Sequence, residues 1–243
     1  MNRRQVLPGL GAALMLAGCA SPTYAFRFKL SLAVEVDGQM KRGFSVVDLE
    51  EYAGSFERMV HTRNYGEAIY LELGAPHTPL VALLTYSTDA NTFPYGMVAL
   101  LRAYAAPSRW DWDRLRNDEL DKLQRRRGVR EISLGSLKLG DLPDFITFDD
   151  PLRPASVRRV DPTHLAATYG NGVRLAQATI EIVDTAGWLS FGGGIPRTSG
   201  IEQKLPWLDA YRNKMLDGRG PGQAGDRSSP THRLNSGSFR SRS

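Results

Sequence analysis

The densest group of residues able to transfer protons is a set of aspartates in the second half of the chain. Four carboxylates fall within a short stretch: Asp141, Asp144, Asp149 and Asp150. Neighbouring carboxyl groups can divide the roles of general acid and general base when their surroundings separate their pKa values. One interpretation of the region 141–150 is therefore a hydrolytic site, with His164 as a further proton-transferring group. The competing interpretation is structural, because aspartates beside Pro143 and Pro151 are typical of turns.

The histidines do not follow a metal-binding pattern. The chain has four of them: His61, His77, His164 and His232. None has a second histidine or a carboxylate at a ligand spacing such as i, i+4 on a helix. We therefore expect no bound metal ion, and we find no motif for another cofactor.

Two further segments are incomplete versions of known motifs. Residues 191–195 are rich in glycine but lack the Lys-Ser/Thr that completes a phosphate-binding loop. Ser190 and Ser199 have neither the Gly-x-Ser-x-Gly turn of a nucleophile nor a nearby histidine as base. We predict a loop at 191–195, and the sequence alone identifies no catalytic residue.

Large aromatic and basic side chains admit both a structural and a ligand-binding interpretation. The chain has four tryptophans: Trp110, Trp112, Trp188 and Trp207. Tryptophans commonly pack in a core, and the alternative is that these line a ligand surface. Arg125, Arg126 and Arg127 fall at the end of a predicted helix, where positive charge interacts favourably with the helix dipole. For both sets we favour the structural interpretation.

The N-terminus has the three-part pattern of a secretory signal. Arg3 and Arg4 supply positive charge, residues 6–17 form an apolar run, and small residues precede Cys19. The run is shorter than the roughly 20 residues that a bilayer-spanning helix needs. We therefore expect residues 1–18 to be a signal peptide.

The tetrapeptide Leu16-Ala17-Gly18-Cys19 resembles the lipobox of bacterial lipoproteins. That resemblance implies cleavage after Gly18 and a lipid thioether on the sulfur of Cys19, the only cysteine in the chain. A single acyl chain binds membranes marginally, whereas the two or three chains of a lipoprotein hold it stably. The resemblance also implies that residues 19–25 link the lipid to a periplasmic domain. Ala20, in place of aspartate, implies transport onward to the outer membrane.

The residues just before the apolar run leave the export route open. Arg3-Arg4-Gln5-Val6-Leu7 resembles a twin-arginine export signal, which would imply that the domain folds before export. Two arginines also serve as the positive segment of an ordinary secretory signal.

The positive charge of the chain is concentrated at its two ends. The net charge is +5, but seven of the 31 basic and two of the 26 acidic residues lie in 1–18 and 217–243. Residues 19–216 therefore carry no net charge, which argues against a nucleic-acid partner. Residues 217–243 are rich in Gly, Ser, Pro and Arg, so we expect a disordered basic tail after a single domain at 26–216. The alternative for the tail is an electrostatic tether to anionic lipid or cell-wall polymer.

Period-two alternation predicts the first strands. In 26–36 apolar and polar residues alternate, so one face of a long strand lies on a core. Asp37-Gly38 tolerates positive φ and predicts a tight hairpin turn, with 40–49 as the return strand. Five further segments are predicted as strands: 67–73, 79–86, 129–134, 145–148 and 174–183.

Helical signals occur in the middle of the chain. Residues 95–105 are rich in Ala, Leu and Met, and 110–127 space their apolar residues as a helix does, ending before Gly128. Asp161 followed by Pro162 predicts a single helical turn with Asp161 as its N-cap. The order of elements predicts an α+β fold, a mainly antiparallel β-sheet with a few helices in the middle of the chain.

Several segments resemble an uncharacterised group of proteobacterial lipoproteins. They are 26–38, 42–43, 66–74, 160–170, 180–182 and 200–208, the last reading Gly-Ile-Glu-Gln-Lys-Leu-Pro-Trp-Leu. The resemblance spans most of the predicted domain and implies a lipoprotein domain, but it carries no activity. The loop at 187–196 and the tail depart from the pattern of the group.

These observations lead to one main expectation and two alternatives. We expect a lipoprotein of the cell envelope whose periplasmic domain binds or scaffolds an envelope protein or cell-wall partner without catalysis. The first alternative is a periplasmic hydrolase that uses the region 141–150. The second is a ligand-binding module with a pocket lined by tryptophan and arginine.

Overall fold

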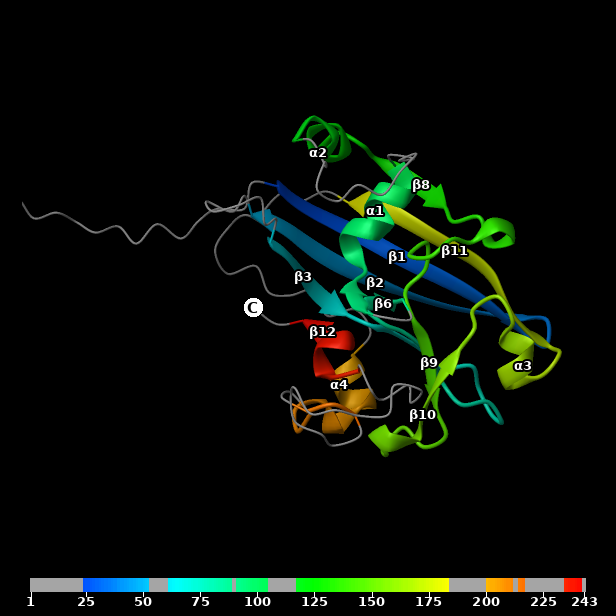
Figure 1. Ribbon diagram of the computed structural model, residues 1–243. Helices are drawn as coiled ribbons and strands as arrows, with labels where there is room; N and C mark the ends of the chain where they lie inside the picture. Colours follow the sequence, from blue (N-terminus) through cyan, green and yellow to red (C-terminus); the bar gives the residue numbers. More distant parts are fainter. Residues whose placement is uncertain are drawn as a thin grey trace, which may run out of the picture.

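The computed structural model describes residues 24–52, 61–88, 91–104, 117–183, 200–211, 214–216 and 234–241. Within these ranges the chain forms antiparallel sheets with short helices, which confirms the predicted α+β fold (Figure 1). Several residues discussed above lie outside the described residues: Cys19 and the rest of 1–23, Trp110, Trp112, Trp188, Ser190, 191–195, Ser199 and His232.

A six-stranded antiparallel sheet is the largest element of the fold. Its strand order is β12-β3-β2-β1-β11-β8. Its strands are β1 (Tyr24–Val36), β2 (Gln39–Tyr52), β3 (His61–Glu67), β8 (Gly128–Glu131), β11 (Val173–Val183) and β12 (Arg240–Ser241). β1 lies near the centre because its alternating sequence lets it pair on both edges while one face stays on the core.

The hairpin of β1 and β2 has the turn that the sequence predicts. Asp37 and Gly38 both have positive φ, 48° and 80°, as a two-residue turn between antiparallel strands requires. The pairing runs from Val36 opposite Gln39 back to Tyr24 opposite Glu51 without a slip. The turn therefore sets the register of the strand pair.

A four-stranded sheet, of order β10-β9-β5-β4, packs beside the first. It contains β4 (Ile69–Leu71), β5 (Leu80–Ala82), β9 (Phe145–Phe148) and β10 (Val157–Val160). The short hairpin β6 (Thr85–Ser87) and β7 (Thr92–Pro94) follows β5. The strand predicted at 67–73 is divided at Ala68, where the chain passes from the six-stranded sheet into the four-stranded one.

The helices are short. They are α1 (Gly96–Tyr104), α2 (Asn117–Gln124), α3 (Leu165–Tyr169) and α4 (Ile201–Lys204), and the 3-10 turns are η2 (Leu134–Ser136), η3 (Pro154–Ser156), η4 (Pro206–Leu208) and η6 (Ser236–Ser238). α1 lies across the six-stranded sheet (Figure 1) and contacts β2, β8 and β11. The helix predicted at 95–105 is thereby confirmed. Of the helix predicted at 110–127, residues 117–127 are described, and α2 covers 117–124 but ends three residues before the predicted end.

Two hydrophobic cores lie on opposite faces of the four-stranded sheet. The first core joins the inner face of the six-stranded sheet to α1 and includes Phe28, which is fully buried. The second core lies between the four-stranded sheet and the C-terminal segments. In β5, Leu80 and Ala82 face the first core and Val81 faces the second. Both faces of β5 are buried, which accounts for its continuous apolar run.

The end of the chain belongs to the second core. Leu234 and Phe239 are fully buried, and Arg240 pairs with Glu67 in the strand pair of β12 and β3. The prediction of a disordered tail over 217–243 is therefore wrong for 234–241. Apolar residues were too sparse there to predict packing, but only two are needed because the sheet supplies the other side of the contact.

The helical turn at Asp161 also differs from the prediction. α3 begins at Leu165 with His164 at its N-cap position, three residues later than expected. The Asp161 carboxylate instead accepts hydrogen bonds from the amide and hydroxyl of Thr163. Such a side-chain turn competes with helix initiation, which explains the later start.

Candidate functional site

The four aspartates of the region 141–150 each lie beside a different arginine. The shortest N–O distances are 3.6 Å from Arg102 to Asp141, 3.3 Å from Arg159 to Asp144, 2.7 Å from Arg158 to Asp149, and 2.9 Å from Arg153 to Asp150. The carboxylates are thus distributed among four ion pairs. This arrangement differs from a catalytic pair, in which two carboxyl groups face one reacting bond.

β9 explains why the aspartates do not converge. The strand occupies the positions between Asp144 and Asp149, and it is fully buried along its length. An extended chain rises about 3.3 Å per residue, so these two aspartates are about 16 Å apart along the strand. The strand therefore separates the region into two pairs of aspartates, one at each of its ends.

Asp144 has the richest polar surroundings of the four. Its Oδ2 accepts a hydrogen bond from Ser87 Oγ at 2.6 Å, and its Oδ1 accepts from the Ser87 amide at 3.2 Å. Arg159 donates through Nη1 to Asp144 at 3.3 Å and through Nη2 to Ser87 Oγ at 3.4 Å. Ser87 Oγ also lies 3.0 Å from Thr92 Oγ1. We call Ser87, Thr92, Asp144 and Arg159 the Asp144 cluster.

The four members of the Asp144 cluster come from three parts of the chain. Ser87 and Thr92 face each other across the hairpin of β6 and β7, Asp144 precedes β9, and Arg159 lies in β10. The Asp144 side chain is 12% exposed and that of Arg159 is 42% exposed. The cluster thus joins the hairpin to the four-stranded sheet and leaves a guanidinium at the surface.

The chemistry available to the Asp144 cluster is binding rather than nucleophilic attack. A serine nucleophile needs an adjacent base, usually histidine, that accepts its proton. Within the described residues, Ser87 Oγ hydrogen-bonds with Thr92, Asp144 and Arg159, and none of these is a histidine. The exposed guanidinium of Arg159 can hydrogen-bond a polar ligand.

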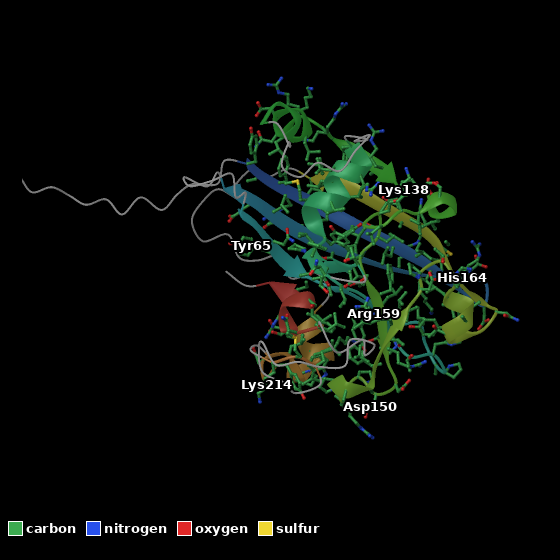
Figure 2. The ribbon with its side chains drawn as sticks, in the orientation of Figure 1. Tyr65, Lys138, Asp150, Arg159, His164 and Lys214 are labelled. Atoms are coloured by element: carbon green, nitrogen blue, oxygen red, sulfur yellow. The ribbon has the colours of Figure 1, made fainter. Side chains whose placement is uncertain are left out.

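His164 lies apart from the aspartates of the region 141–150. Its Nδ1 is 3.0 Å from Asp161 Oδ2 and 2.8 Å from the Thr163 hydroxyl, and its side chain is 75% exposed. Burial raises the pKa of Asp161, but hydrogen bonds from Thr163 and His164 outweigh it and lower the pKa below the usual value. Figure 2 shows Arg159, Asp150 and His164 at three separate places on the fold. The structure therefore does not bring His164 to the predicted hydrolytic region.

Trp207 and His77 both make structural contacts. Trp207 is buried in the second core and its Nε1 donates to the Pro151 carbonyl at 2.7 Å. Its core position agrees with the structural interpretation. His77 packs edge-on against Tyr169, with ring centroids 6.1 Å apart.

Two ion-pair groups outside the region 141–150 were not foreseen in the sequence. Asp48 is almost completely buried and receives two hydrogen bonds from Arg27, at 2.5 and 2.8 Å. This hydrogen bonding to Asp48 raises the pKa of Arg27. In the second core, Arg240 lies against Glu202 and Asp209.

Comparison with protein-family models, with curated proteins and with solved structures gives no match. The described residues contain no group of three or more His, Cys, Asp or Glu side chains placed to hold a metal ion. They also contain no helix that is both long enough and apolar enough to cross a membrane.

The Asp144 cluster could not be predicted from the sequence, because its residues are far apart in the chain. Ser87 and Asp144 are 57 positions apart in the chain, and Ser87 and Arg159 are 72 apart. No spacing rule links residues at such separations, because sheet pairing alone brings them together. The ion-pair partner of Asp141 is 39 positions away and that of Asp144 is 15 positions away, whereas Arg153 is only three residues from Asp150.

Proposed function

We propose that the protein is a lipid-anchored lipoprotein of the bacterial cell envelope, with a non-catalytic binding or scaffolding domain in the periplasm. The observation that carries the proposal is the sequence Leu16-Ala17-Gly18-Cys19 at the end of a charged and then apolar start. Lipid on Cys19 attaches the domain to a membrane, most suitably the outer membrane.

Two structural features support this role. β1 begins at Tyr24, so a folded domain follows the proposed attachment residue after a very short link. The aspartates of the region 141–150 are held in separate ion pairs, which gives the hydrolase alternative less support than the binding role. Among the described residues, these four carboxylates do not face one another as a catalytic pair would, which supports a domain that acts through its surfaces.

Lipidation of Cys19 is tested by labelling growing cells with an alkyne fatty acid. The full chain should take up the label and sediment with membranes, whereas Cys19→Ser should do neither because it has no thiol to form the thioether. Ser21→Ala, two positions away, serves as the matched control and should label like the parent. Equal labelling and processing of Cys19→Ser and the parent would contradict the proposal.

The non-catalytic role has its own test. The purified protein is screened against ester, glycoside, phosphate and peptide substrates, together with Asp144→Asn and Asp149→Asn. We expect no turnover above buffer. Turnover that these substitutions abolish would instead establish the hydrolase alternative.

A further inference from the structure

Basic side chains gather where α2 ends and β8 begins. All five are exposed to solvent: Lys122, Arg125, Arg126, Arg127 and Arg130. The exposed acidic residues of the same segment, 121–131, are Asp121 and Glu131. We call the five residues the α2–β8 basic cluster. It is an excess of positive charge on a domain whose overall charge is balanced.

Only part of the cluster has a structural explanation. Arg127 Nη1 donates to the carbonyls of Gln124 and Arg126, at 2.6 and 2.7 Å, and so satisfies the C-terminal end of α2. The Arg130 guanidinium lies over the ring of Tyr104, 5.6 Å from its centroid. Among the described residues, Arg125 and Arg126 make no ion pair with a carboxylate, and both side chains are exposed.

Strand pairing places this cluster at one particular end of the six-stranded sheet. Ile182 is paired with Phe28 on one side and with Gly128 on the other. Gly128, which directly follows Arg127, is therefore two strands from Phe28, a distance of about 10 Å. Phe28 is only four residues from Tyr24, where β1 begins.

The length of the chain between Cys19 and Tyr24 ties the proposed anchor to the same end. Cys19 is five residues before Tyr24, and an extended chain reaches at most about 3.6 Å per residue. The attachment point therefore lies within about 18 Å of the start of β1 whatever the conformation of the link. Figure 1 shows α2 beside the start of β1, and the hairpin of β1 and β2 at the opposite end.

We infer that the end of the domain bearing the α2–β8 basic cluster lies against anionic phospholipid headgroups. The inference rests on the proposed lipid anchor, which brings this end of the sheet to the bilayer. The partner is a phosphodiester surface because guanidinium groups bind phosphate oxygens well and because an anchored domain meets such a surface first. The cluster then orients the domain, with the hairpin at Asp37 and Gly38 directed away from the membrane.

The expected strength follows from the electrostatics of bilayers. Each Lys or Arg close to an anionic surface strengthens binding roughly fivefold, and the effect falls off within about 8–10 Å at moderate salt. Neutralising Arg125 and Arg126 together should therefore weaken binding to anionic vesicles roughly 25-fold. Raising the salt concentration should weaken the parent more than the variant.

The first test uses the full chain carrying Cys19→Ser, so that acylation contributes nothing. Flotation is measured with vesicles of phosphatidylcholine alone and with vesicles that also contain phosphatidylglycerol. We expect Arg125→Gln/Arg126→Gln to lose most of the preference for the anionic vesicles. The residues 1–18 are present in every variant, so their contribution cancels in the comparison.

The matched control removes the same charge at the other end of the sheet. Lys41 pairs with Val34, six residues and about 20 Å beyond Phe28 along β1. Lys41→Gln/Arg42→Gln should change the preference less than about twofold. An equal loss in both double variants would show that net charge decides, and no loss in Arg125→Gln/Arg126→Gln would exclude the cluster. Either result overturns the inference.

Orientation is tested in the lipidated protein reconstituted in vesicles with phosphatidylglycerol. A fluorophore on Gln124→Cys should be quenched by a nitroxide on the lipid headgroup, and one on Gln39→Cys should not. Equal quenching at the two positions would overturn the proposed orientation. Acylation of Cys19 is read separately from the mass of the N-terminal peptide, so failure of the anchor is distinguishable from failure of the basic cluster.

Discussion

The two hydrophobic cores differ in how far local sequence patterns predict them. The first core rests on the hairpin of β1 and β2, in which alternating residues and an Asp-Gly turn specify the strands and their register. The second core collects residues from β5, β9, α4 and the last part of the chain. The first core starts from a hairpin of neighbouring strands, to which distant segments such as α1, β9 and β11 add further residues. The second core is built largely from segments that are far apart in the chain and meet only in the folded state.

This difference teaches why composition is a poor guide to the end of the chain. A segment with few apolar residues cannot form a core by itself, so the composition of residues 217–243 is typical of a disordered segment. Two of its side chains, Leu234 and Phe239, nevertheless complete a core whose other side already exists. The second core therefore depends on a few contacts between distant segments.

The largest expected effect comes from truncating one aromatic ring in each core. Phe28→Ala and Phe239→Ala should each lower the free energy of unfolding by about 3–5 kcal/mol, because both rings are fully buried. Urea unfolding of the purified protein measures both. Equal costs would show that the second core is as well packed as the first.

A substitution at an exposed position is the control for Phe28→Ala and Phe239→Ala. Leu152 is 68% exposed, so Leu152→Ala should change the free energy of unfolding by no more than about 0.5 kcal/mol. Phe239→Ala that behaves like Leu152→Ala would show that the C-terminal segment does not pack in solution. If the alanine variants do not fold, Phe28→Leu and Phe239→Leu give a milder comparison, with an expected cost of about 1 kcal/mol each.

An intermediate effect is expected at the ion pairs of the second core. Arg240 is 5% exposed in its side chain and lies against Glu202 and Asp209, with 2.5 Å from Nη2 to Asp209. Arg240→Met keeps the aliphatic stem but leaves both carboxylates without this partner, at a cost of about 1.5–3 kcal/mol. Thermal unfolding measures the change.

The matched control for Arg240 is an exposed ion pair. Arg158 and Asp149 are 51% and 61% exposed, so Arg158→Met should cost no more than about 1 kcal/mol. Costs of similar size for the two arginines would mean that the C-terminal strand contributes little to the second core.

The smallest effect is expected at a contact that is entirely local in sequence. Burial works to raise the pKa of Asp161, but hydrogen bonds from Thr163 and His164 lower it overall. Its stabilisation is therefore present above the unfolded pKa of about 3.9 and is lost as the pH falls through the lower folded value. Because this carboxylate is more than half exposed, the contribution should not exceed about 0.5 kcal/mol.

Asp161→Asn removes that contribution, and chemical denaturation at several pH values measures it. The stability difference from the parent should be constant near neutral pH and should shrink as the pH falls below about 4. A difference that grows on acidification would contradict the direction of the pKa shift. The exposed hydrogen bonds of Asp161 would then contribute more to the free energy of unfolding than their exposure suggests.

The elements with internal periodicity were the ones predictable from sequence. The prediction at 145–148 coincides with β9, and those for β1, β2, α1 and β11 are within a few residues of their ends. β3, with the sequence His-Thr-Arg-Asn-Tyr-Gly-Glu, has no apolar alternation and was missed. It is a strand because β2 and β12 supply hydrogen-bonding partners on both edges.

Predictions about the site had the same limit. The four aspartates were identified as a group because they are close in sequence, but β9 places two at each end. Ser87 and Arg159, which complete the surroundings of Asp144, lie on other strands and carried no motif. Chemical type is readable in a sequence, whereas convergence of side chains depends on sheet pairing.

The sequence by itself determined the α+β class, the central hairpin and its register, because alternation and turn chemistry act over neighbouring residues. It also supplied the signal-like start and Cys19, on which the proposed anchor rests. Only the tertiary structure decided that the chain end packs in a second core, that the aspartates are separated, and that the basic cluster lies beside the start of β1. Those outcomes depend on contacts between segments far apart in the chain, whose closure is decided by the packing of the whole fold.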